Sequence, residues 1–204
     1  MSFRRRLLIA LLGIGFLFGC SHGRTSLLNI RYQSYKEFPS LQQKIGTTLA
    51  VLPLKDERKE TLYVGLHTPY QGISSYFKSD PFPLEKAIEG SLSQVLSRHG
   101  VKTVGVSDWD GRPESLKGMD ADSILMVEMK RFWIEGNASL FRTKVRTEVH
   151  LVIHLGVKRE GKVFSRNVNV EKEMTVSRLT PERAEQMINQ VLTEIFDAFF
   201  SNPY

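Results

Sequence analysis

The sequence predicts an α/β (α+β) fold, a two-layer sandwich with two amphipathic helices packed on one face of a largely antiparallel sheet of about four strands. The helices follow from apolar residues that recur every three or four positions over residues 84–99 and 184–199. The sheet follows from residues 141–157 and 163–176, where apolar and polar side chains alternate. Elements that are each apolar on one side bury those sides against one another, which favours a layered domain.

Sequence signals at both ends set the bounds of the helices. The first helix is expected over residues 81–99, with Asp80 as its N-cap and Pro81 in its first turn. Gly100 follows at the left-handed position with which many helices end. The last helix is expected to begin after Thr180, whose hydroxyl can cap the first turn.

The predicted strands are short apolar runs or alternating segments bounded by turn residues. They cover residues 47–55, 101–106, 123–134, 141–157 and 163–176. The last two flank a turn that contains Gly161, so we expect them to pair as an antiparallel hairpin. A further edge strand is possible near Leu28, Ile30 and Tyr32, which alternate with polar residues.

The N-terminus has the pattern of a bacterial lipoprotein signal. Three arginines at residues 4–6 precede an apolar run over residues 7–18, and Gly19 stands before Cys20, the only cysteine in the chain. A transmembrane anchor would need about 20 apolar residues, which makes it the weaker interpretation. We therefore expect a signal peptide at residues 1–19, cleavage before Cys20, and lipidation of Cys20.

This signal also predicts the domain organisation and the location. The mature chain would consist of a lipidated tether with a possible edge strand over residues 20–46, followed by a single α/β domain over residues 47–204. Ser21 after the lipidated cysteine resembles the outer-membrane sorting pattern, since an aspartate there is typical of lipoproteins kept in the inner membrane. We expect a lipid anchor on the periplasmic face of the outer membrane, with the inner membrane as the alternative.

Charge and residue types exclude several classes of function. Loss of the signal removes three arginines and lowers the formal net charge from +6 to +3. Because no block of basic residues follows the signal, we expect no nucleic-acid partner. With Cys20 modified, no thiol is left for a disulfide or a metal, and Asp108 and Asp110 are more typical of a turn than of a metal or acid–base site. We expect no metal and no cofactor.

No GxSxG or HExxH pattern indicates an enzyme, so we expect none. The lipid signal and one compact domain favour a non-enzymatic binding or accessory component of an envelope assembly, with an envelope protein or lipid as its partner. The alternative is an accessory protein for lipid or lipopolysaccharide transport or assembly. In that case phosphates would be bound by basic residues, namely Lys130, Arg131, Arg142, Lys144 and Arg146.

A loop over residues 58–77 is expected to carry the contact site. It is longer than most connections and rich in aromatic residues, and such loops are often functional. Its candidate contact residues are Tyr63, His67, Tyr70 and Tyr76. The alternative is that these side chains cover the edge of the sheet and stabilise the domain.

Several short motifs resemble those of the YajG-type lipoproteins. They are Asp56 and Arg58 after the first strand, Val64 with Gly65, the helix end at residues 96–100, and residues 191–193 in the last helix. The resemblance covers most of residues 47–200. The same outline is similar to TolB amino-terminal domains, to the lipopolysaccharide-assembly lipoprotein LptE, and to auxiliary lipoproteins of ABC-type transporters. It implies a fold and an envelope location rather than a reaction.

Overall fold

The computed structural model describes residues 24–204 of the chain. The predicted signal peptide at residues 1–19 and the predicted lipidation site Cys20 lie outside this range. In chain order the elements are β1 (Thr25–Asn29), α2 (Leu41–Ile45), β2 (Thr48–Val51), β3 (Lys55–Asp56), β4 (Gly65–Thr68), β5 (Ser75–Asp80), α3 (Leu84–Arg98), β6 (Lys102–Gly105), a 3₁₀ turn (Glu114–Gly118), β7 (Ser123–Ala138), β8 (Thr143–Val157), β9 (Lys162–Val176) and α4 (Pro181–Ser201).

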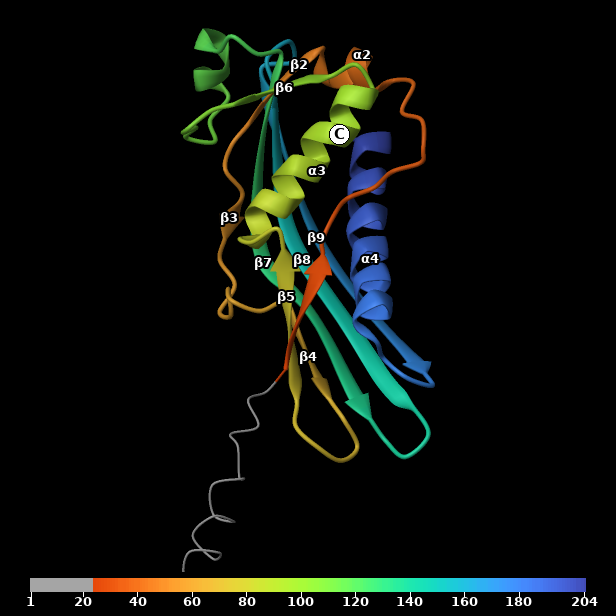
Figure 1. Cartoon of the computed structure of the whole chain (residues 1–204). Helices are drawn as coiled ribbons and strands as arrows, with labels where there is room; N and C mark the ends of the chain where they lie inside the picture. Colours follow the sequence, from red (N-terminus) through yellow and green to blue (C-terminus); the bar gives the residue numbers. More distant parts are fainter. Residues whose placement is uncertain (1–23) are drawn as a thin grey trace, which may run out of the picture.

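The sheet is organised around β7. One edge of β7 pairs with antiparallel β8 along almost its whole length, and β8 pairs in turn with antiparallel β9. The other edge pairs in parallel with three short strands in succession, β2, β3 and β4. Strand β6 adds to β2, whereas β5 and then β1 add to β4, so the sheet divides into two branches beyond β7 (Figure 1).

The predicted two-layer sandwich of two helices on about four largely antiparallel strands is wrong. Residues 24–204 form one mixed sheet of nine strands, with three α-helices. Strands β3, β4 and β5 have only two, four and six residues and lie among charged residues, glycines and prolines that are typical of a loop. The equally short β2 and β6 were predicted because each is an apolar run bounded by turn residues. The parallel pairs join segments far apart in the chain, and such pairing leaves no local pattern. The expected loop over residues 58–77 therefore contains β4 and part of β5.

The longer elements agree with the periodicity. The two predicted helices are α3 and α4, and the three long strands are β7, β8 and β9. Thr180 caps α4 as predicted, since its Oγ1 accepts a hydrogen bond from the backbone N–H of Arg183 at 3.3 Å. The predicted cap of α3 is wrong, because Asp80 ends β5 and Pro83 is the N-cap residue. The possible strand near Leu28 is β1, which pairs in parallel with β5.

Helices α3 and α4 lie across one face of the sheet and enclose the main core with it (Figure 1). We call this the helix face and its reverse the open face. Leu92 of α3 and Phe196 of α4 are almost fully buried against inward residues of the central strands, such as Val127 of β7 and Leu151 of β8. A smaller core, built around Trp109 and other residues, lies on the open face at one end of the sheet.

Candidate contact surface

The open face of the β1–β5–β4 branch carries a group of apolar side chains. Leu66 of β4 lies opposite Tyr76 of β5, and Thr25 of β1 lies beside Tyr76 on its other side. Register partners point to the same face of a sheet, and so do residues two apart along a strand, which places Leu27 on this face as well. Phe77, next to Tyr76, is buried in the core on the helix face.

Tyr63 completes the group by stacking on Tyr76. The centroids of the two rings are 4.5 Å apart and the ring planes meet at 27°. Leu27 and Tyr76 are 60% and 39% exposed, while Tyr63 and Leu66 are half-buried. We call Leu27, Tyr63, Leu66 and Tyr76 the open-face patch. Aromatic side chains that are held rigidly and partly exposed are typical of protein contact surfaces.

A buried ion pair holds Tyr63 in place. The Nε and Nη2 atoms of Arg58 donate to the two carboxylate oxygens of Asp56, at 2.9 and 2.7 Å. The same guanidinium donates to the backbone carbonyls of Tyr63 and Thr61, at 3.0 and 3.1 Å. The side chains of Arg58 and Asp56 are only 3% and 6% exposed. The pair therefore ties the segment between β3 and β4 to the sheet and fixes the backbone at Tyr63.

His67 lies on the other side of the sheet from the open-face patch. It follows Leu66 in β4, and adjacent strand residues point to opposite faces. Its Nε2 is buried, with no hydrogen-bond partner among the described residues. Burial, together with the positive charge of Arg178, lowers the pKa of His67, so the ring is neutral at neutral pH.

Tyr70 lies in the turn between β4 and β5, at the end of the branch. The structure thus brings Tyr63 and Tyr76 together and places His67 and Tyr70 elsewhere. Leu27 belongs to the patch and was not among the predicted contact residues. Its signal is the consecutive pair of leucines at residues 27 and 28, because two neighbouring apolar residues in a strand put one on each face.

The basic residues considered as phosphate ligands lie mostly in ion pairs. Lys130 pairs with Glu57 and Glu128, Arg131 with Glu148, Lys144 with Glu173, and Arg146 with Glu148 and Glu171. Hydrogen bonds from Lys130 and Lys55 lower the pKa of Glu57 to about 2. The open face of β7–β9 therefore carries a network of ion pairs, in which most of the positive charges are neutralised by carboxylates.

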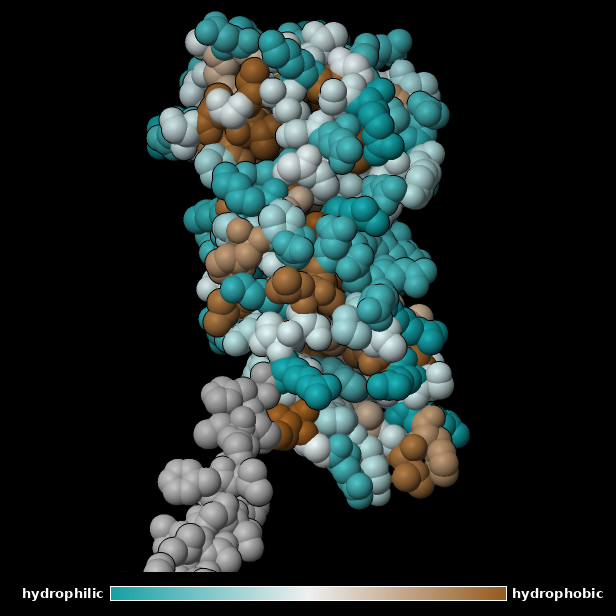
Figure 2. All heavy atoms as spheres, viewed as in Figure 1, coloured by the Kyte–Doolittle hydropathy of each residue, from teal (hydrophilic) through white to brown (hydrophobic). Residues whose placement is uncertain are grey.

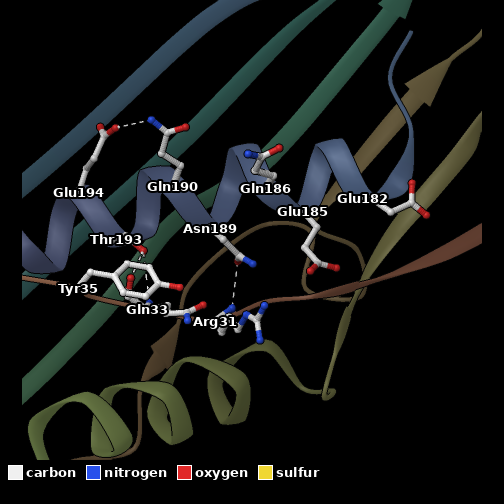
Figure 3. Close-up of a pocket in the computed structure, with 10 residues that line it drawn as sticks. All are labelled: Arg31, Gln33, Tyr35, Glu182, Glu185, Gln186, Asn189, Gln190, Thr193 and Glu194. Atoms are coloured by element: carbon white, nitrogen blue, oxygen red, sulfur yellow. Dashed lines mark hydrogen bonds between the residues drawn. The ribbon is translucent and has the colours of Figure 1, made fainter. Parts of the chain in front are cut away.

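A groove of about 560 Å³ lies between α4 and the extended segment that starts at the last residue of β1, residues 29–35, which we call the strap (Figure 3). Successive turns of α4 bind the backbone of the strap. Glu185 accepts from the N–H of Asn29 at 2.9 Å, and Asn189 accepts from the N–H of Arg31 at 3.0 Å. These polar side chains serve to hold the strap on the domain.

The strap is also fixed from within the core. The hydroxyl of Tyr32 donates to Asp197 of α4 at 2.9 Å, and the N–H of Tyr32 donates to Ser91 of α3 at the same distance. Burial and the carboxylate of Asp197 raise the pKa of Tyr32. The strap thus joins the start of the domain to both long helices.

Within residues 24–204, no cluster of three or more His, Cys, Asp or Glu side chains could hold a metal ion. Ser75 and Lys78 have the S-x-x-K spacing used by some acylating enzymes. They lie on β5, where residues three apart point to opposite faces, so the hydroxyl and the amine do not meet. Among the described helices, none has the combination of length and apolar character that crossing a membrane requires.

The fold of this chain has a counterpart among solved structures, whereas its sequence has no match among families. No family model matches the sequence, and no curated protein matches it either, so the resemblance to the YajG-type lipoproteins stays a prediction. A DUF330 protein from Xanthomonas campestris is similar in structure, with a TM-score of 0.53 at 16% identity over 85% of this chain and 92% of that one.

Two further solved structures are less similar. A putative neuraminyllactose-binding hemagglutinin homolog from Helicobacter pylori has a TM-score of 0.44 at 15% identity, over 83% of this chain and 90% of that one. A lipoprotein from Neisseria meningitidis has a TM-score of 0.37 at 13% identity, over 74% of this chain and 99% of that one. The fold is therefore one that the chain shares with the DUF330 protein from Xanthomonas campestris.

Proposed function

We propose that this chain is a lipoprotein of the bacterial envelope, anchored through Cys20 on the periplasmic face of the outer membrane. There it acts as a non-enzymatic accessory component that binds another envelope protein through the open-face patch. The observation that supports the proposal best is the position of the patch. Leu27 belongs to β1, the first element of the domain, which begins five residues after Cys20.

The chemistry of the patch favours a protein partner. Tyr63 and Tyr76 lose little side-chain freedom on binding, because their rings already stack on each other and Arg58 holds the backbone at Tyr63. The patch lies beside the paired charges of β7–β9, and a polar rim around an apolar centre is typical of protein interfaces. A phosphate-binding surface would need several free cations, whereas four of the five candidates, Lys130, Arg131, Lys144 and Arg146, are paired with carboxylates, and among residues 24–204 only Arg142 of the five has no such pair. This weighs against the lipopolysaccharide alternative.

Replacing Cys20 by alanine tests the anchor. The variant should lose all lipid, because the Cys20 thiol is the only one in the chain. Metabolic labelling with palmitate checks this, and a Ser21→Ala variant that keeps the thiol should still be labelled. Label that survives in Cys20→Ala would refute the lipid anchor.

Replacing Tyr63 by alanine tests the contact surface. With a photoreactive residue at position 27, the unaltered patch should form a crosslinked adduct with the envelope partner in cells. Tyr63→Ala should lose most of this adduct, because the stacked pair of Tyr63 and Tyr76 is broken and the partner binds less well. The domain itself should lose roughly 1–2 kcal/mol, from the aromatic pair and from the apolar area of the half-buried ring. A Tyr63→Phe control keeps the ring and should keep the adduct. If Tyr63→Ala melts several degrees lower while its folded fraction still forms the normal adduct, then the tyrosines stabilise the domain and are not contact residues.

A further inference from the structure

Four large apolar side chains protrude from two neighbouring turns. Leu140 and Phe141 lie in the turn between β7 and β8 and are 63% and 79% exposed. Tyr70 and Ile73 lie in the turn between β4 and β5 and are 56% and 52% exposed. Figure 2 shows apolar side chains projecting at the lower end of the molecule, over the β7–β8 turn. Such side chains do not stabilise the domain, since they lie outside its core.

The strand register brings both turns to one end of the sheet. Thr68, the last residue of β4, pairs with Asn137 near the end of β7. Ala138 pairs with Thr143 across the β7–β8 turn. The two turns are therefore adjacent, and both mark the lower end of the molecule in Figure 1.

The N-terminal end of the domain lies at this same end. Thr25, the first residue of β1, pairs with Tyr76, which follows the β4–β5 turn by two residues. Four residues stand between Cys20 and Thr25, and the five steps from one Cα atom to the other span at most about 17 Å. A lipid on Cys20 would hold the membrane within that distance of β1, and the two turns would then be the part of the domain nearest to the bilayer.

The charges near the turns are suited to a lipid headgroup layer. Arg24, Arg142 and Arg178 are exposed at this end, and none of them forms an ion pair with a carboxylate of residues 24–204. The nearby acids include Glu173, which pairs with Lys144, and Glu182 in the first turn of α4. Apolar and aromatic side chains flanked by arginines are typical of protein surfaces at the boundary between headgroups and acyl chains.

We propose that the β4–β5 and β7–β8 turns form a membrane-contact surface, in which Leu140, Phe141, Tyr70 and Ile73 enter the headgroup layer of the bilayer that holds the lipid anchor. This inference rests on the proposed lipidation of Cys20. It gives the domain a fixed orientation, with its long axis rising from the membrane and β1 beside the lipid. The open-face patch then points along the membrane plane, toward a neighbouring envelope protein, and not toward the bilayer.

Fluorescence quenching in protein-free vesicles tests this orientation. The full chain, processed in cells, would carry one added cysteine labelled with an environment-sensitive fluorophore, either at Phe141→Cys or at Glu160→Cys. Glu160 is an exposed residue in the β8–β9 turn, at the opposite end of the sheet, so it serves as the matched control. The vesicles contain phosphatidylethanolamine and phosphatidylglycerol, with a nitroxide on acyl carbons near the headgroups.

The label at position 141 should be quenched several-fold more strongly than the label at position 160 and should shift its emission to the blue. Equal quenching at the two positions, or none at position 141, would overturn the inference. The exposed side chains of the two turns would then be assigned to contact with a protein. The mass of the purified chain shows beforehand whether Cys20 carries lipid. An unlipidated chain would refute the proposed anchor, whereas a lipidated chain without quenching at position 141 would refute only the membrane-contact surface.

Discussion

Replacing Asp56 by alanine is expected to lower the free energy of unfolding by about 3–5 kcal/mol, the usual effect of leaving one partner of a buried ion pair unpaired. The guanidinium of Arg58 would stay buried after losing both hydrogen bonds to the carboxylate. Because Arg58 also holds the carbonyls of Thr61 and Tyr63, the segment before β4 should loosen together with the patch. Urea unfolding measures the loss of stability.

Lys59 provides the control for this variant, since it is an exposed residue close to the pair. Lys59→Ala should change the free energy of unfolding by no more than about 0.5 kcal/mol, as surface substitutions usually do. Equal midpoints of unfolding for Asp56→Ala and Lys59→Ala would contradict the role given to the ion pair.

Replacing Leu92 by aspartate should destabilise the domain by about 4 kcal/mol or more. Leu92 is 2% exposed, on the side of α3 that faces the sheet, so the change removes a buried leucine and inserts a carboxylate without a partner. Thermal unfolding followed by circular dichroism checks the result. Gln94→Asp adds the same charge at an exposed position two residues away and should melt close to the wild type. If Leu92→Asp and Gln94→Asp had the same melting temperature, this face of α3 would not be buried.

Periodicity predicted the long elements and short apolar runs predicted β2 and β6, whereas β3, β4 and β5 were missed. Residues 184–199 repeat the helical spacing of apolar residues over several turns, and residues 141–157 alternate apolar and polar side chains over many positions. This local spacing alone identifies α4 and β8. Strand β4 has four residues and is a strand only because β5 and β7 supply its hydrogen bonds. The nine-stranded mixed sheet depends on such pairings, which is why the predicted number of strands was wrong.

The candidate site was predictable in its residue types and unpredictable in its arrangement. Exposed tyrosines in a long segment indicated Tyr63 and Tyr76, and the structure stacks them. The register of β4 against β5 decides that His67 points to the helix face and that Leu66 joins the patch. The sequence holds no local sign of that register, because it is set by how both strands pack beside β7.

The most direct test of the central claim is photocrosslinking in cells, with a photoreactive amino acid in place of Tyr76 in the open-face patch and, separately, in place of Gln94 on the exposed side of α3. We predict a discrete adduct with an envelope protein from position 76, none from position 94, and loss of the adduct when Cys20→Ala is combined with the probe at position 76. Absence of an adduct at position 76, or equal adducts from both positions, would contradict the account of a lipid-anchored protein that binds its partner through the open-face patch.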